Sequence, residues 1–182
     1  ASVRTVHSVE DIEPGSHIIN VLDLENLDYS SIIHGQVSEA AGRASVEWVL
    51  EAGRLATNNQ IDAIVTAPIN KEACQLAGYE DIGHMELFQK QTGASSVATM
   101  LMSGDLRVVH LTTHRSLRIA CDYVTHANVL DKILLTDKHF RDWGFVCPRI
   151  GVAALNPHAS DGGLLGNEEK TQIFPAVSQA KE

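Results

Sequence analysis

Three short polar segments each follow a run of residues typical of a β-strand, and two of them carry a histidine. They cover residues 66–71, 112–116 and 156–158. Ligands of α/β proteins bind beyond the carboxyl ends of strands, so we expect these segments to line one crevice. His114 and His158 lie in two of them and offer the imidazole groups that divalent metal ions favour. Both are therefore candidate metal ligands, and the alternative is that each is an ordinary polar loop residue.

A second candidate site begins at Gly83-His84-Met85-Glu86, where a helix start is expected. Free N–H groups in the first turn of a helix attract anions, and the His84 imidazole beside them adds a donor for a phosphate or carboxylate. The alternative is that His84 merely caps the helix. Lys71, Arg115 and Arg118 are further cations near these segments, and each is equally well explained as a solvated surface charge.

A glycine-rich segment after His158 comes close to a dinucleotide-binding fingerprint without meeting it. Gly163 and Gly166 have the right spacing, but Asp161 stands where the first glycine belongs. We therefore expect no standard Rossmann phosphate turn here. Glu169, together with the acidic residue before it, is expected to complement the dipole of the following helix. The residues assign no catalytic base and no cofactor contact.

Segments typical of strands and of helices alternate along most of the chain. This alternation predicts an α/β fold with a mixed, largely parallel sheet flanked by helices. The length suits one domain or two small ones, no boundary is visible within residues 1–182, and both ends resemble truncations. Strands are expected over residues 17–24, 61–66, 96–102, 106–112 and 149–155, and helices over residues 38–57, 70–77, 85–92, 117–123 and 128–143.

Composition excludes several classes of partner. The formal charge of −9 and the aromatic fraction of 5% argue against nucleic acid, which needs clustered cations and stacking platforms. No apolar run is long enough to span a membrane. The three cysteines are widely spaced and form no C-x-x-C pair, which favours a reducing cytoplasm over a disulfide framework.

Four motifs occur in an order that resembles the 4-hydroxythreonine-4-phosphate dehydrogenase family of vitamin B6 biosynthesis. They are Thr66-Ala67-Pro68-Ile69-Asn70-Lys71, Gly83-His84-Met85-Glu86, Thr112-Thr113-His114 and Asn156-Pro157-His158-Ala159 with Gly162-Gly163. The resemblance implies an isocitrate/isopropylmalate dehydrogenase-like fold and a homodimer with its active site at the subunit interface. It also implies oxidation of a phosphorylated hydroxy amino acid by NAD or NADP, decarboxylation of the product, and a divalent metal ion (Zn, Mg or Co) held by three histidines.

Carried onto this sequence, the resemblance makes His114 and His158 metal ligands and His84 and Met85 substrate contacts. Family members usually have Thr where this chain has Met85, and a thioether cannot donate a hydrogen bond to an anion. The family's third metal histidine would lie beyond residue 182, so the chain is interpreted as a central fragment that is inactive alone. The alternatives are a paralogue acting on a four-carbon sugar acid phosphate (threonate or erythronate 4-phosphate) and a non-catalytic metal or small-molecule binding domain.

Overall fold

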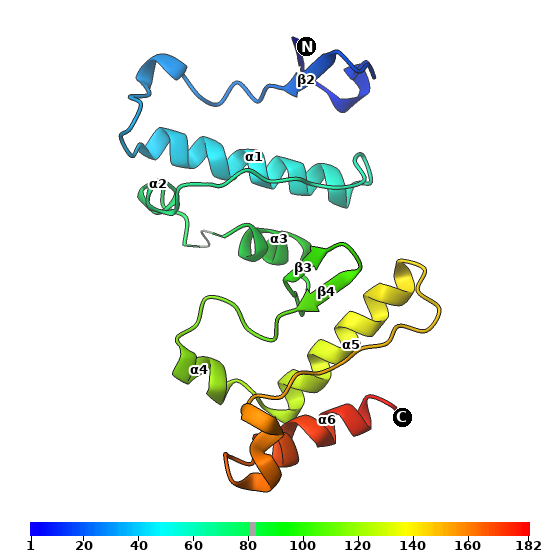
Figure 1. Cartoon of the computed structure of the whole chain (residues 1–182). Helices are drawn as coiled ribbons and strands as arrows, with labels where there is room; N and C mark the ends of the chain where they lie inside the picture. The colour runs from blue at the N-terminus through cyan, green and yellow to red at the C-terminus, as the bar shows by residue number, and fades with distance from the viewer. Residues whose placement is uncertain (81–82) are drawn as a thin grey trace. The chain divides into compact units, whose positions relative to one another are not determined.

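The computed structural model describes residues 1–80 and 83–182, which form two compact units. The N-terminal unit covers residues 1–95 and the C-terminal unit covers residues 96–182. Each unit combines helices with one two-stranded sheet, as Figure 1 shows along the colour gradient. The α/β class expected from the sequence is confirmed. Among the described residues, no helix has the length and apolarity needed to cross a membrane.

The N-terminal unit begins with a parallel pair of strands. β1 (Ser2–Val6) pairs with β2 (Ile18–Leu22) in a register that sets Ser2 opposite Ile18 and Val6 opposite Leu22. The turn between the strands contains η1 (Val9–Asp11), whose first turn is capped by the Ser8 hydroxyl accepting from Glu10 N–H at 3.2 Å. β2 confirms the strand expected over residues 17–24, and a second short turn, η2 (Tyr29–Ser31), follows it.

Three helices then build the core of the N-terminal unit. α1 (Glu39–Thr57) starts where the Ser38 side chain accepts from Ala41 N–H, α2 (Lys71–Leu76) starts at Asn70, and α3 (His84–Thr92) ends at Gly93 in the left-handed region. These starts and stops are the ones that the sequence predicts. The buried cluster at their contact contains Val46, Val49, Cys74 and Leu87.

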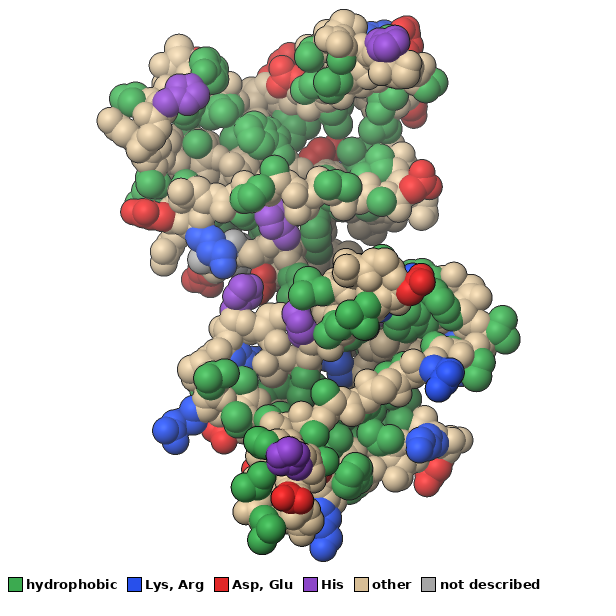
Figure 2. Space-filling view, in the orientation of Figure 1, with side chains coloured by type: hydrophobic (Ala, Val, Ile, Leu, Met, Phe, Trp, Pro, Cys, Tyr) green, Lys and Arg blue, Asp and Glu red, His purple; other side chains and the backbone are tan. Residues whose placement is uncertain are grey.

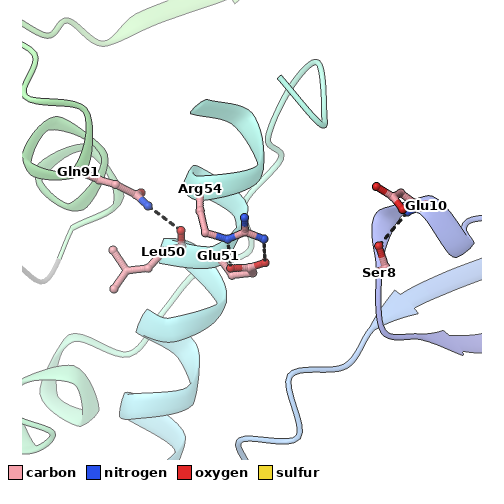
Figure 3. A network of polar contacts seen from close by, with 6 residues as sticks. All are labelled: Ser8, Glu10, Leu50, Glu51, Arg54 and Gln91. Atoms are coloured by element: carbon pink, nitrogen blue, oxygen red, sulfur yellow. Dashed lines mark hydrogen bonds and ion pairs between the residues drawn. The ribbon is translucent and has the colours of Figure 1, made fainter. Parts of the chain in front are cut away.

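Two close contacts fix how α1 meets its neighbours. A Cβ atom at Gly42 would overlap the carbonyl oxygen of Ala73, so only glycine lets α2 approach α1 this closely. On α3, the Gln91 side-chain amide donates to the carbonyl oxygen of Leu50 at 2.8 Å. Figure 3 shows this bond crossing from α3 to α1, beside the surface ion pair of Glu51 with Arg54. Packing against α1 therefore positions both α2 and α3.

The C-terminal unit pairs an antiparallel hairpin with helices. β3 (Met100–Ser103) and β4 (Leu106–Val109) form an antiparallel hairpin from parts of two expected strands, with Met100 opposite Val109. α4 (Leu117–Asp122), α5 (His126–Asp142) and α6 (Phe174–Gln179) follow. The side chain of Ser116 caps the start of α4, and that of Thr125 caps the start of α5. The buried apolar residues of this unit come mainly from α5 and from the stretch that leads into α6, namely Val129, Phe140, Ile173 and Ala176.

Two of the expected strands are not formed within residues 1–80 and 83–182, where one described sheet is parallel and the other antiparallel. Residues 61–66 and 149–155 pair with no neighbouring strand, so the described sheets have only two strands each. A β-branched run favours an extended chain, but a neighbouring strand must supply the ladder hydrogen bonds. Apolar side chains in both segments are exposed, with Val65 98% and Val152 39% exposed. Figure 2 shows hydrophobic side chains at the surface of both units.

Candidate functional site

His158 lies in a turn with an uncommon backbone. The turn is η3 (Pro157–Gly163), and five consecutive residues in it, 158–162, have positive φ values between 50° and 71°. Four of the five are not glycine. The left-handed region costs an L-residue about 1–2 kcal/mol, so contacts outside the turn must hold it.

The carboxylate of Glu169 supplies those contacts. Glu169 is 1% exposed, and its Oε1 accepts from the backbone N–H of Asn156 at 2.6 Å. Its Oε2 accepts from the side-chain amide of Asn156 at 3.0 Å and from the hydroxyl of Ser160. Asn156 precedes His158 by two residues and Ser160 follows it by two, so one carboxylate binds the chain on both sides of the histidine.

These hydrogen bonds favour the ionised carboxylate. Donation from the Asn156 side chain, its backbone N–H and the Ser160 hydroxyl lowers the pKa of Glu169 from 4.5 to about 2. Glu168 accepts from the same Asn156 amide at 2.7 Å. The pKa of Glu168 is also lowered, first by its own backbone N–H and then by Asn156.

The Glu169 carboxylate and its bonds to Asn156 and Ser160 are called the clamp below. The clamp is anchored in the folded helices rather than in the loop. Glu169 opens a π-helical turn, η4 (Glu169–Ile173), which runs directly into α6. The side-chain oxygen of Gln172 in this turn accepts from the backbone N–H of His126 at the start of α5, at 2.8 Å. Isolated π-turns occur frequently at functional sites. The turn that carries His158 is thus tied to the packed part of the C-terminal unit.

His114 shares two features with His158. It lies between β4 and α4 with a φ of +52°, and both imidazoles are on exposed residues. The guanidinium carbon of the neighbouring Arg115 lies 4.4 Å from the ring centroid of Tyr123, so this cation stacks on the ring. Histidine enters the left-handed region more readily than most residues, and such backbones cluster at functional sites. Two of the seven described non-glycine residues with positive φ are therefore the two histidines singled out from the sequence.

No complete metal centre is found in the part of the chain that the structure describes. Within residues 1–80 and 83–182, no three His, Cys, Asp or Glu side chains lie close enough together to hold a metal ion. A catalytic zinc ion takes three protein ligands and keeps one position open. His114 and His158 lie in the same unit, and both carry the imidazole donor that such a set uses.

His84 and Met85 are placed in the other unit, as the first two residues of α3. The helix starts at Gly83, which provides no side-chain cap, and the Glu86 carboxylate lies close to this glycine. The Nε2 atom of His84 is buried and has no hydrogen-bond partner among the described residues. An unpaired buried polar atom costs about 1–3 kcal/mol, which favours a ligand that would pair with it. Met85 is half-buried beside it.

Sequence reasoning missed Glu169, Asn156 and Ser160 as supports of the site. Only a complement to the helix dipole was expected of Glu169. The available signal was the Asn-Pro pair before a glycine-rich turn, because a chain that turns there leaves a backbone N–H that needs an acceptor. A carboxylate within the next helical turn is the simplest such acceptor.

Comparison with solved structures places the fold in a class of dehydrogenases with the isocitrate dehydrogenase-like fold. A crystal structure of 4-hydroxythreonine-4-phosphate dehydrogenase from Klebsiella pneumoniae matches 100% of this chain and 55% of its own, with a TM-score of 0.94 and 35% identity. Another 4-hydroxythreonine-4-phosphate dehydrogenase, from Burkholderia phymatum, matches 98% of this chain and 54% of its own, with a TM-score of 0.85 and 34% identity. The family described as pyridoxal phosphate biosynthetic protein PdxA matches residues 2–182, and the chain belongs to this family.

Curated relatives of the chain carry a different substrate in their names. A Fusobacterium nucleatum protein named "Putative D-threonate 4-phosphate dehydrogenase" is 38% identical over 97% of this chain and 54% of its own length. A protein of the same name from Symbiobacterium thermophilum is 39% identical over 90% of this chain and 49% of its own length. The chain spans about half the length of the curated relatives it matches.

Proposed function

We propose that the chain is part of an NAD(P)-dependent dehydrogenase that oxidises a phosphorylated four-carbon hydroxy acid. The observation that carries this proposal is the match of the whole chain to a 4-hydroxythreonine-4-phosphate dehydrogenase at a TM-score of 0.94. The leading substrate is 4-hydroxythreonine 4-phosphate, whose oxidised product is a β-keto acid that loses carbon dioxide. The backbone geometry of His114 and His158 supports a site at the positions that the sequence motifs indicate.

D-threonate 4-phosphate is the second candidate substrate. The curated relatives at 38% and 39% identity are named for it. The two substrates differ at C2, where one has an amino group and the other a hydroxyl group. Met85 stands where the resemblance leads us to expect Thr, and its thioether offers no donor, so the substrate groups near it must be satisfied by other residues.

Within the proposed site, His114 and His158 hold a divalent metal ion (Zn, Mg or Co), and a third ligand comes from outside this chain. When bound, the ion supplies Lewis acidity for the substrate oxygen. The chain's own contribution is placement. His158 presents its imidazole from a turn held by Glu169, and His114 presents its imidazole from the turn before α4. Fixing ligands in advance is what makes such a site selective and fast.

In the N-terminal unit, we propose that His84 at the start of α3 binds the anionic end of the substrate. Its Nε2 atom has no hydrogen-bond partner among the described residues, which supports donation to a phosphate or carboxylate oxygen. When bound, NAD or NADP would supply the hydride acceptor for this oxidation. The segment after His158 lacks a Rossmann fingerprint, so the cofactor is expected to bind elsewhere.

We further propose that the complete enzyme is a cytoplasmic homodimer with no nucleic-acid partner. All three cysteines are free, and Cys121 and Cys147 are exposed as thiols, which is typical of a reducing compartment. Apolar side chains exposed in both units leave surface for a partner subunit to cover.

The test is a substrate and cofactor panel on the longest natural protein that contains this sequence. We expect reduction of NAD or NADP with 4-hydroxythreonine 4-phosphate or D-threonate 4-phosphate, and loss of turnover after chelation that Zn²⁺ or Co²⁺ restores. The 182-residue chain alone is expected to be inactive. Turnover that is indifferent to chelation contradicts the metal role, and turnover by the chain alone contradicts the incomplete site.

A further inference from the structure

We infer that Glu169 is a positioning residue whose carboxylate holds the left-handed turn around His158 and so fixes that imidazole for metal binding. The inference deepens the proposed function and rests on it for the role of His158. Glu169 itself faces inward and is 1% exposed, whereas His158 lies on the exposed side of the turn. The carboxylate therefore acts through the backbone that carries the histidine.

Both oxygens of the Glu169 carboxylate accept hydrogen bonds from the turn. Oε1 accepts from the backbone N–H of Asn156, and Oε2 accepts from the Asn156 amide and the Ser160 hydroxyl. Both oxygens are thus occupied by donors of the turn, and these donors are neutral groups. This arrangement fixes the backbone on both sides of the histidine, which a single bond to the histidine ring would not achieve.

Apart from the Glu169 contacts, the described bonds of the turn are local. The start of η3 has no side-chain cap, and its local backbone bonds include Ala159 N–H to Asn156 O at 3.2 Å and bonds from the Leu164 and Leu165 N–H groups to Ser160 O. These bonds lie within or beside the strained turn and move with it. Residues in the left-handed region persist only where the surrounding structure determines them.

The π-turn that carries Glu169 is held by packed helices. Glu169 belongs to the π-turn that continues into α6, where Ile173 and Ala176 are buried and Gln172 binds the start of α5. The clamp therefore transmits the position of two packed helices to the exposed His158. Second-layer carboxylates that orient ligating histidines typically change metal affinity by 10- to 100-fold when they are mutated.

The experiment compares Co²⁺ affinity of the full chain with that of the variant Glu169→Gln. Glutamine has the same shape, but either orientation of its amide sets an NH₂ group against a donor of Asn156 or Ser160. We expect Co²⁺ affinity to fall by about 10- to 100-fold. The matched control is Glu168→Gln, because Glu168 contacts only the Asn156 side chain of the turn and is expected to change affinity by less than about threefold.

A double-mutant cycle separates positioning from general destabilisation. In the His158→Ala background, Glu169→Gln should no longer change Co²⁺ affinity, because the group it positions is gone. An equal loss in both backgrounds would overturn the inference, and so would wild-type affinity in Glu169→Gln. Should that variant fail to fold, Ser160→Ala removes one donor and leaves the carboxylate in place, and a fall in affinity of severalfold is expected.

A second readout does not depend on metal at all. The through-space NMR dipolar coupling between the amide and α protons of His158, read as their cross-peak intensity, is strongest at positive φ because these protons are then closest, and it should weaken in Glu169→Gln. An unchanged coupling would overturn the inference. If the wild-type chain bound no Co²⁺ through His158 while this coupling changed as expected, the metal role in the proposed function would fail and the hold of Glu169 on the turn would stand.

Discussion

The two regions that carry the candidate residues are held by different physical means. His84 begins α3, a regular helix whose position depends on apolar packing and on the bond from Gln91 to Leu50 of α1. His158 lies in a strained turn that depends on one buried carboxylate in the C-terminal unit. We therefore expect the stability of the first region to depend on side-chain volume. We expect the stability of the second to depend on the charge of Glu169 and on the backbone freedom of the turn.

The largest expected effect tests the packed region. In Gly42→Ala the added methyl group meets the Ala73 backbone, so we expect the N-terminal unit to lose about 3 kcal/mol of stability. Denaturant unfolding, with amide hydrogen exchange assigned to each unit, measures the change. The control is Gly151→Ala, where the added atom meets nothing within 4 Å. A stabilised Gly42→Ala chain, as helix propensity alone would give, contradicts the close contact.

An effect of pH tests the carboxylate clamp. The pKa of Glu169 is about 2 in the folded chain and 4.5 when unperturbed, so its contribution is complete above pH 4.5. It is lost as pH falls from 4.5 towards 2, because protons then bind the unfolded chain in preference. We expect the unfolding free energy of the C-terminal unit to fall over this range, and to fall less steeply in Glu169→Gln. Parallel curves for the two proteins would contradict the clamp.

The smallest expected effect comes from replacing alanine with glycine, once in the turn around His158 and once in α1. Ala159→Gly replaces a left-handed residue with φ +52° and should stabilise the C-terminal unit by about 1 kcal/mol. Ala52→Gly in the interior of α1 should destabilise the N-terminal unit by a similar amount, about 1 kcal/mol. Thermal unfolding of both variants checks the opposite signs. A loss of stability in both would show that the turn is not strained.

Local signals account for what the sequence predicts correctly. Ser38, Asn70 and Ser116 are side-chain caps, and α2, α3 and the β3–β4 hairpin begin and end near the expected residues. Each of these features depends on residues a few positions apart, so a single sequence contains the necessary information. The family resemblance, which rests on four ordered motifs, is confirmed by the match over residues 2–182.

Features that depend on distant partners were not predictable in the same way. Residues 61–66 have the composition of a buried strand, but a strand needs a neighbour, and the described residues provide none. The positive φ of Ala159 is likewise invisible in its residue type, because alanine has no preference for that region and the hold of Glu169 on Ser160 acts from outside the turn. The sequence thus identified the histidines, and only the structure identified what holds one of them.

The central claim is that His114 and His158 bind one metal ion. A Co²⁺ titration of the chain, followed through the imidazole NMR signals of both histidines, tests it most directly. We predict that both signals shift together with one ion per chain, and that His114→Ala removes the effect on His158. Two independent titrations, or a shift at His158 that His114→Ala leaves unchanged, would contradict the account.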